Sequence, residues 1–335
     1  MFGFILFVSL LMFMAKEERE SLDKNKEEPY KMELIDASKF AEHEKTMKDL
    51  YNENLPFYLF LIAVNMAILA VFFIGVFLDI NLLYKWKKNN PFLKRTLEPA
   101  SISWDFNDII RFVIMFYAFG YAFMLLQAAL SEKYPDFISR NLRFILNTTV
   151  IDIAGILFVL NFVVFIHKEK LASIGITFKN FARNIFYGIS GYAAIVPLLF
   201  ITMIITAIII TILKYEPPVQ QIVDVLLKEQ KVPVLVYSSI FAAIAGPIME
   251  EIFFRGFMYN ALKKHLGIFW GIAITATIFS LLHGHLVGFM PILILGILLT
   301  YLYEKTGSLI PSITVHITHN LASLLMVLIT KSIYF

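Results

Sequence analysis

The sequence has no cysteine and few charged residues. The absence of cysteine from 335 residues excludes disulfides, thiolate catalysis and cysteine-ligated metal clusters. Any nucleophile must therefore act through oxygen or nitrogen. Charged side chains make up 16% of the chain and hydrophobic ones 59%, whereas soluble domains average about 25% and 45–50%. This composition predicts a polytopic membrane protein.

The chain also lacks a basic block of the kind that follows a phosphate backbone. The formal net charge of +3 comes from Lys and Arg scattered among short loops. Nucleic acid is therefore not an expected partner, and the lipid bilayer is. No retention or transit signal is recognisable, so the expected location is a prokaryotic cell membrane.

Apolar segments long enough to span a bilayer recur along the chain. A spanning helix needs about 20 predominantly apolar residues. The candidate segments are 57–80, 109–130, 145–166, 185–213, 234–258, 268–283, 287–303 and 309–330. We predict an all-α polytopic helical bundle of about eight transmembrane helices, with a polar site in the C-terminal half.

The loops and the N-terminal region complete this organisation. Residues 1–56 are a short apolar segment followed by a charged, solvated region. Basic residues gather in the loops after the first and third spans, and again at Lys263 and Lys264. These loops are predicted to face the cytoplasm. Residues 219–230 have the periodicity of a helix lying at the membrane surface.

Two adjacent carboxylates and an arginine lie inside a predicted span. A carboxylate at bilayer depth costs about 2.5–3.5 kcal/mol on insertion scales, so such groups normally face a protein or water cavity. Glu251 and Arg255 are four residues apart, share one helix face and are expected to form a salt bridge. Glu250, about 100° around the helix, has no local cation. It is the predicted general base.

Two later apolar segments add further polar residues at the same spacing. Phe279 precedes His283 by four residues, and His316 precedes Asn320 by four. His283 is predicted to share a water molecule with Glu250. His316 and Asn320 offer an imidazole and an amide N–H as donors to a developing oxyanion. Together these residues fit hydrolysis of an amide by activated water, without a covalent intermediate.

In these three motifs the chain resembles the intramembrane glutamate-type proteases related to the type II CAAX prenyl endopeptidase. This group is also called the CAAX protease and bacteriocin-processing family. The family pattern is Glu-Glu-x-x-x-Arg, Phe-x-x-x-His and His-x-x-x-Asn on successive segments. The matching residues are Glu250, Glu251, Arg255, Phe279, His283, His316 and Asn320. Similarity extends over roughly 171–325.

The resemblance implies a membrane endopeptidase that cleaves a peptide or protein substrate, which is prenylated in the namesake relatives. Glu250 and His283 would activate water, and His316 and Asn320 would form the oxyanion hole. Glu251 and Arg255 would have supporting roles, and Phe279 would pack. Residues 171–335 would be the catalytic core, and 57–170 a set of N-terminal transmembrane helices. No cofactor is implied.

Two other functions use the same residues. Glu250, His283 and His316 could instead bind zinc, because two histidines and a carboxylate with one open position recur in catalytic zinc sites. A non-catalytic scaffold or immunity-type binding protein could keep the polar cluster for helix packing. Asp152, an acid inside the 145–166 span, also calls for a functional hypothesis, with a pore-facing or packing role as the alternative.

Overall fold

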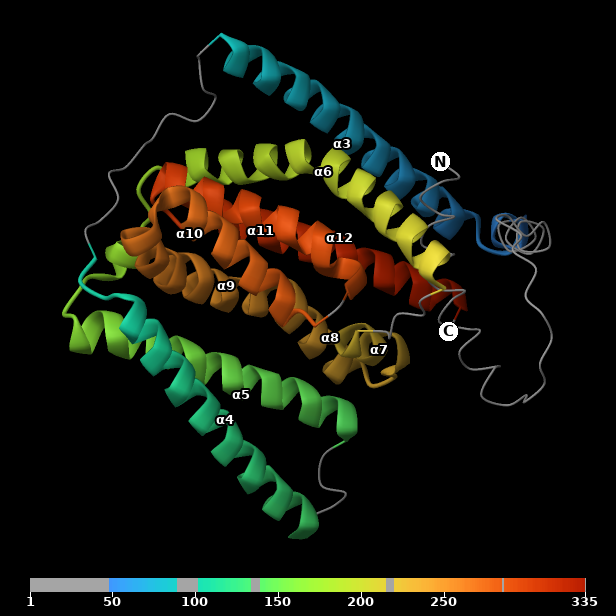
Figure 1. Cartoon of the computed structure of the whole chain (residues 1–335). Coiled ribbons are helices and arrows are strands. Elements are labelled where there is room, and N and C mark those ends of the chain that lie inside the picture. The colour runs from blue at the N-terminus through green and yellow to red at the C-terminus, as the bar shows by residue number, and fades with distance from the viewer. Residues whose placement is uncertain (1–47, 89–101, 134–138, 215–219, 285, 335) are drawn as a thin grey trace. The chain divides into compact units, whose positions relative to one another are not determined.

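The computed structural model describes residues 48–88, 102–133, 139–214, 220–284 and 286–334. The described residues form helices and no strand (Figure 1). In chain order these are α3 (Leu55–Lys87), α4 (Phe106–Lys133), α5 (Arg140–Leu160), η1 (Asn161–Ile166), η2 (Leu171–Ile174), α6 (Phe181–Leu213), α7 (Gln221–Lys228), α8 (Val232–Ile240), η3 (Phe241–Ala245), α9 (Gly246–Glu251), η4 (Ile252–Tyr259), α10 (Asn260–Leu282), α11 (Leu286–Thr306) and α12 (Ile310–Tyr334). The predicted all-α class is confirmed. Most of the predicted region 1–56 lies outside the described residues.

Seven helices in the described part are long and apolar enough to cross a membrane. The protein is therefore a multi-pass integral membrane protein. One of these seven segments, Val232–Leu282, is 51 residues long and contains both predicted spans, 234–258 and 268–283. Gly267 interrupts this segment with non-helical backbone at φ 78° and ψ 176°. A side chain at that φ would be strained, so glycine permits the break between the two arms.

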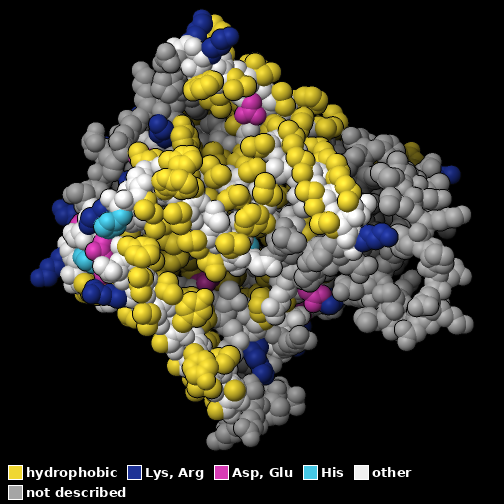
Figure 2. Space-filling view, in the orientation of Figure 1, with side chains coloured by type: hydrophobic (Ala, Val, Ile, Leu, Met, Phe, Trp, Pro, Cys, Tyr) yellow, Lys and Arg dark blue, Asp and Glu magenta, His cyan; other side chains and the backbone are white. Residues whose placement is uncertain are grey.

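Residues Leu78–Phe335 form one compact unit, which contains every predicted site residue; the described residues before it belong to a separate unit. Large hydrophobic side chains are exposed on many of the helices. Figure 2 shows them covering most of the face in view, with Lys and Arg at its margins. Exposed apolar surface of this extent is what lipid contact requires.

Aromatic side chains join the α4–α5 pair to the helices that carry the site. The rings of Phe112 on α4 and Phe253 on η4 lie 4.6 Å apart. Trp104, just before α4, stacks on Phe257 at 5.9 Å and is fully buried. Lipid tails are as apolar as these side chains, so close packing and hydrogen bonds hold the helices together. Region 57–170 therefore supplies α4 and α5 as packing partners of the C-terminal core.

Two π-helical segments, η3 and η4, flank the short helix α9. Proline has no N–H and its ring clashes with the preceding turn, so Pro247 disturbs the ladder where η3 ends. The N–H of Gly246 bonds to the carbonyl of Phe241, five residues back. At the end of η4 the amide of Asn260 donates to the carbonyl of Gly256 at 2.8 Å. π-helical turns are rare and occur often at functional sites.

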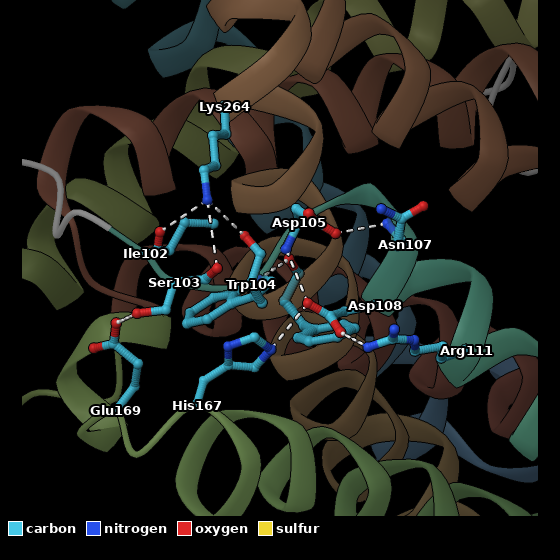
Figure 3. Close-up of polar contacts among 11 residues, drawn as sticks. Ile102, Ser103, Trp104, Asp105, Asn107, Asp108, Arg111, His167, Glu169 and Lys264 are labelled. Atoms are coloured by element: carbon cyan, nitrogen blue, oxygen red, sulfur yellow. Dashed lines mark hydrogen bonds and ion pairs between the residues drawn. The ribbon is translucent and has the colours of Figure 1, made fainter.

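A polar cluster joins two loops to the first turns of α10 at one end of this unit (Figure 3). Lys264 donates to the carbonyls of Ile102, Ser103 and Trp104 at 3.2, 3.4 and 3.3 Å. The Ser103 hydroxyl donates to Glu169 at 2.7 Å, and this hydrogen bond lowers the pKa of the Glu169 carboxyl. The loops that were predicted to share one side of the membrane therefore lie together.

Trp104, whose carbonyl belongs to this cluster, also bonds to the buried core. The indole N–H of Trp104 donates to the carbonyl of Phe257 in η4 at 3.1 Å. Beside it, His167 Nε2 lies 2.9 Å from Asp108 Oδ2, which also accepts from the backbone N–H of Asp105 at 3.1 Å. Asp108 thus links the start of α4 to the loop after η1.

We expect Trp104→Phe to lower the free energy of unfolding by about 0.5–1.5 kcal/mol, because it removes a buried hydrogen bond to the Phe257 carbonyl, which keeps the backbone N–H of Asn260 as a donor. Thermal unfolding of detergent-solubilised protein, followed by circular dichroism, measures the change. Trp270→Phe is the matched control, since that side chain is 57% exposed. Equal stability of both variants would contradict an anchoring role for Trp104.

Candidate active site

The predicted site residues come from four elements that pack together. Glu250 and Glu251 end α9, and Arg255 follows in η4. Phe279 and His283 lie at the end of α10, and α12 carries His316 and Asn320. Helix α12 packs on both η3 and α9, and α10 packs on η4. Residues 65 positions apart in sequence are thereby brought into contact.

The buried centre of the site is the Glu251 carboxylate. Its Oε1 accepts a hydrogen bond from Arg255 Nη1 at 2.6 Å and another from His316 Nδ1 at 2.8 Å. Glu251 and Arg255 are fully buried, and the predicted salt bridge between them is confirmed. Two charge-assisted hydrogen bonds offset the cost of burying this carboxylate. The contact with His316 was not predicted, because the sequence spacing reports only on neighbours within one helix.

His316 lies between the two adjacent carboxylates. Its Nδ1 carries the proton donated to Glu251, and its Nε2 lies 3.7 Å from Glu250 Oε2. That separation is too long for a hydrogen bond. Glu251 therefore sets the orientation of the ring, and the free nitrogen is directed toward Glu250.

Glu250 is the accessible carboxylate of the pair. Its side chain is 36% exposed, whereas Oε2 is buried and has no hydrogen-bond partner within the described part of the chain. The group therefore has one side open to solvent and an inner oxygen directed toward His316. A general base needs access to the water that it activates, and Glu250 has that access.

The Phe279 ring contacts the arginine and both histidines of the predicted site. The Arg255 guanidinium lies 4.3 Å from the centre of its ring, a cation–π contact. The rings of His283 and His316 lie 4.7 and 5.6 Å from it at steep angles. Phe279 is fully buried. Both predicted imidazoles therefore border one aromatic ring.

His283 ends α10 at the exposed rim of the site. Its Nδ1 lies 2.7 Å from the carbonyl of Phe279, one turn back. A carbonyl only accepts, so Nδ1 must carry the proton and Nε2 keeps its lone pair when the ring is neutral. This tautomer leaves His283 able to accept a hydrogen bond from water.

Asn320 is one turn beyond His316 on α12. Its amide donates to the carbonyl of Ala242, in η3, at 2.9 Å. An amide has two N–H groups, so this bond uses one of them. The contact fixes Asn320 against the π-helical turn that precedes α9.

The zinc alternative would use Glu250, His283 and His316. Catalytic zinc sites need three protein ligands at about 2 Å, and no three His, Asp or Glu side chains among the described residues are grouped in this way. The contact of His316 Nδ1 with Glu251 leaves Nε2 as the ring nitrogen that a metal would bind.

Two further titratable residues border the predicted set. Asp152 of α5 interacts electrostatically with Glu250. His319 interacts with His316 and His283, and its Nδ1 is buried without a partner in the described residues. Asp152 could be recognised in the sequence as an intramembrane acid, but its partner could not. His319 carries no comparable signal, because it lies outside the four-residue spacing.

Comparison with known proteins agrees with the predicted membrane protease. Residues 232–322 match the family model of the type II CAAX prenyl endopeptidase Rce1-like proteins, and all seven predicted site residues lie in that range. The chain is also 32% identical over 101 residues to a Bacillus subtilis (strain 168) protein named "Putative membrane peptidase YdiL". That match covers 30% of this chain and 39% of the relative. No solved structure matches.

We expect Glu251→Gln to destabilise the protein by about 3–5 kcal/mol, because a buried arginine loses its carboxylate partner. Asp224→Asn is the control: Asp224 pairs with Lys228 at the same four-residue spacing, but both side chains are more than 40% exposed. Exposed pairs contribute little. Thermal unfolding in detergent measures both variants, and a Glu251→Gln protein as stable as wild type would show that the buried pair is dispensable.

Proposed function

We propose that this multi-pass membrane protein is an intramembrane endopeptidase, because residues 232–322 match the family model of the type II CAAX prenyl endopeptidase Rce1-like proteins. It hydrolyses a peptide bond near the membrane surface. The domain match covers the predicted site and less than a third of the chain, so the activity of the whole protein remains part of the proposal. The observation that carries it is the position of His316, held by Glu251 with its free nitrogen toward Glu250.

Glu250 and His283 activate the attacking water in this proposal. The Glu250 carboxylate removes a proton as the water oxygen attacks the substrate carbonyl carbon. The unprotonated Nε2 of His283 accepts the second hydrogen of the same water and so directs its lone pair toward that carbon. The half-buried side chain of Glu250 and the exposed one of His283 support these roles, because both groups need contact with solvent and substrate.

His316 and Asn320 stabilise the oxyanion. To donate from Nε2, His316 must carry protons on both ring nitrogens, and the Glu251 carboxylate accepts the hydrogen bond from Nδ1. Asn320 contributes the amide hydrogen that is not bonded to Ala242. Glu251 and Arg255 act as positioning residues. Donors of this kind typically contribute about 10²- to 10³-fold in rate when they are preorganised.

The substrate is a peptide or protein presented at the bilayer. Relatives whose description names CAAX prenyl substrates make a prenylated C-terminal peptide one candidate, and a membrane-associated precursor peptide is another. The bacterial relative agrees with the expected prokaryotic cell membrane.

We expect Glu250→Gln to reduce peptide hydrolysis by about 10²–10⁴-fold, because the amide cannot take a proton from water. Proteomics of cells with wild type or variant should find peptide termini that appear only with wild type. A synthetic peptide spanning such a site then measures the purified proteins. Asp224→Asn, on the surface helix α7, should remain fully active. Retained cleavage by Glu250→Gln would contradict the proposal and favour the scaffold or immunity-type alternative.

The zinc alternative has a separate test. We expect purified wild-type protein to keep its hydrolytic rate after dialysis against a strong chelator, because the protein's own carboxylate and imidazole activate the water. Elemental analysis of the dialysed protein is the second measurement. Loss of activity that zinc restores, at one equivalent per chain, would instead assign Glu250, His283 and His316 as ligands.

A further inference from the structure

Asn260, the first residue of α10, bonds to two neighbouring elements. It is buried, and its side-chain amide donates to the carbonyl of Gly256 in η4 at 2.8 Å and to the Tyr303 hydroxyl of α11 at 2.6 Å. The same nitrogen lies 3.4 Å from the carbonyl of Arg255. An amide nitrogen has two N–H groups. Both are therefore engaged, with the end of η4 and with α11.

The Gly256 carbonyl lies near the point where η4 gives way to α10. A π-helical hydrogen bond joins an N–H to the carbonyl five residues back, and an α-helical one to the carbonyl four residues back. One carbonyl is therefore passed over when the chain returns from the π pattern to the α pattern. A buried carbonyl without a donor costs free energy. The Asn260 amide supplies a donor at this transition and so favours the π-helical turn over a regular α-helix.

Helix α11 binds the end of the same turn through two further hydrogen bonds. Glu304, next to Tyr303, accepts from the Tyr259 hydroxyl at 2.9 Å and from the Lys263 ammonium at 2.8 Å. Tyr259 and Tyr303 are both buried. Since the end of η4 is fixed to α11 in this way, a change in the hydrogen-bond pattern of η4 must displace the residues that precede this end.

Those preceding residues belong to the candidate active site. Arg255 lies within η4, and Glu251 immediately precedes η4. An α-helix turns by about 100° per residue, so a one-residue change of pattern in η4 would rotate Glu251 by roughly that angle relative to the fixed end. Glu251 Oε1 accepts from Arg255 Nη1 at 2.6 Å and from His316 Nδ1 at 2.8 Å. A rotation of this size would break the contact with His316.

We infer that Asn260 is a positioning residue for the proposed hydrolysis; this inference rests on the proposed function. Asn260 stabilises the π-helical turn, the turn presents Glu251 to His316, and Glu251 orients the His316 ring toward Glu250. The acceptors of the Asn260 amide all belong to η4 and α11. Asn260 therefore acts through the backbone and not on the substrate, so its loss should affect kcat more than KM.

The test compares Asn260→Leu with Asn260→Ser. Leucine has a similar size but no donor, so the π-helical turn loses its support. A serine hydroxyl can donate to the carbonyl one turn back in its own helix, which here belongs to Gly256. With the synthetic peptide that spans the wild-type cleavage site, we expect Asn260→Leu to lower kcat by about 10²-fold with KM little changed. Asn260→Ser should recover most of the wild-type kcat.

Asn184→Leu is the matched control. Asn184 of α6 is also buried, and its amide donates to the main-chain carbonyl of Lys179 at 3.2 Å. Helix α6 carries none of the predicted site residues. We expect Asn184→Leu to lower thermal stability and to leave the kcat of the folded protein unchanged. Thermal unfolding in detergent is measured for every variant, and Asn260→Ala replaces Asn260→Leu, with the same expectations, if leucine prevents folding.

A second measurement does not depend on activity. In protein labelled with isotope-enriched histidine, the His316 Nδ1–H that bonds to Glu251 should give a ring N–H signal in nuclear magnetic resonance spectra. The loss of this signal in His316→Gln assigns it. We expect Asn260→Leu to shift or broaden the signal, because the Glu251 carboxylate moves away. Asn260→Ser and Asn184→Leu should leave it in place.

The possible outcomes distinguish this inference from the proposed function. If folded Asn260→Leu keeps both the wild-type kcat and the His316 signal, the positioning role is overturned. It is also overturned if Asn184→Leu loses as much kcat as Asn260→Leu, because the loss would then reflect general destabilisation. Retained cleavage by Glu250→Gln would refute the proposed function alone, since the His316 signal would still show whether Asn260 positions Glu251.

Discussion

The site depends on one buried carboxylate. Glu251 accepts hydrogen bonds from Arg255 on its own helix and from His316 on α12. Arg255 neutralises the charge that would otherwise be costly at this depth, and Phe279 covers the guanidinium. His316 is thereby fixed in one tautomer and one orientation. Glu250 is left as the accessible carboxylate, so the two adjacent glutamates have opposite environments and different roles.

Irregular backbone makes this arrangement possible. Helix α9 has six residues and is bounded by π-helical turns on both sides. The amides of Asn320 and Asn260 donate to carbonyls within or beside these turns. Backbone groups must be satisfied inside the protein at bilayer depth, because lipid offers no partner. Asn320 therefore has a structural contact in addition to its proposed contribution to the oxyanion hole.

Helices α4 and α5, at the N-terminal end of the compact unit, pack on the helices that carry the site. Trp104 and Lys264 attach the start of α4 to η4 and α10, and rings on α4 pack against η4. Helix α5 in turn packs on α9 and η4, the elements that carry Glu250 and Arg255.

The sequence by itself determined the fold class and identified the candidate residues of the site. Long apolar segments can satisfy their backbone in lipid only as helices, and four-residue spacing determines which side chains share a helix face. The sequence predicted the Glu251–Arg255 salt bridge for that reason. It also placed two spans within Val232–Leu282, but hydropathy could not show that the backbone between them is interrupted at Gly267.

Only the tertiary structure decided which residues from different helices meet. The contacts of His316 with both glutamates and of Asn320 with Ala242 join segments at least 65 residues apart. No periodicity reports on such pairs, since they depend on how helices cross and rotate against one another. Helix packing in lipid is set by close contacts and interhelical hydrogen bonds, which exist only once the chain has folded.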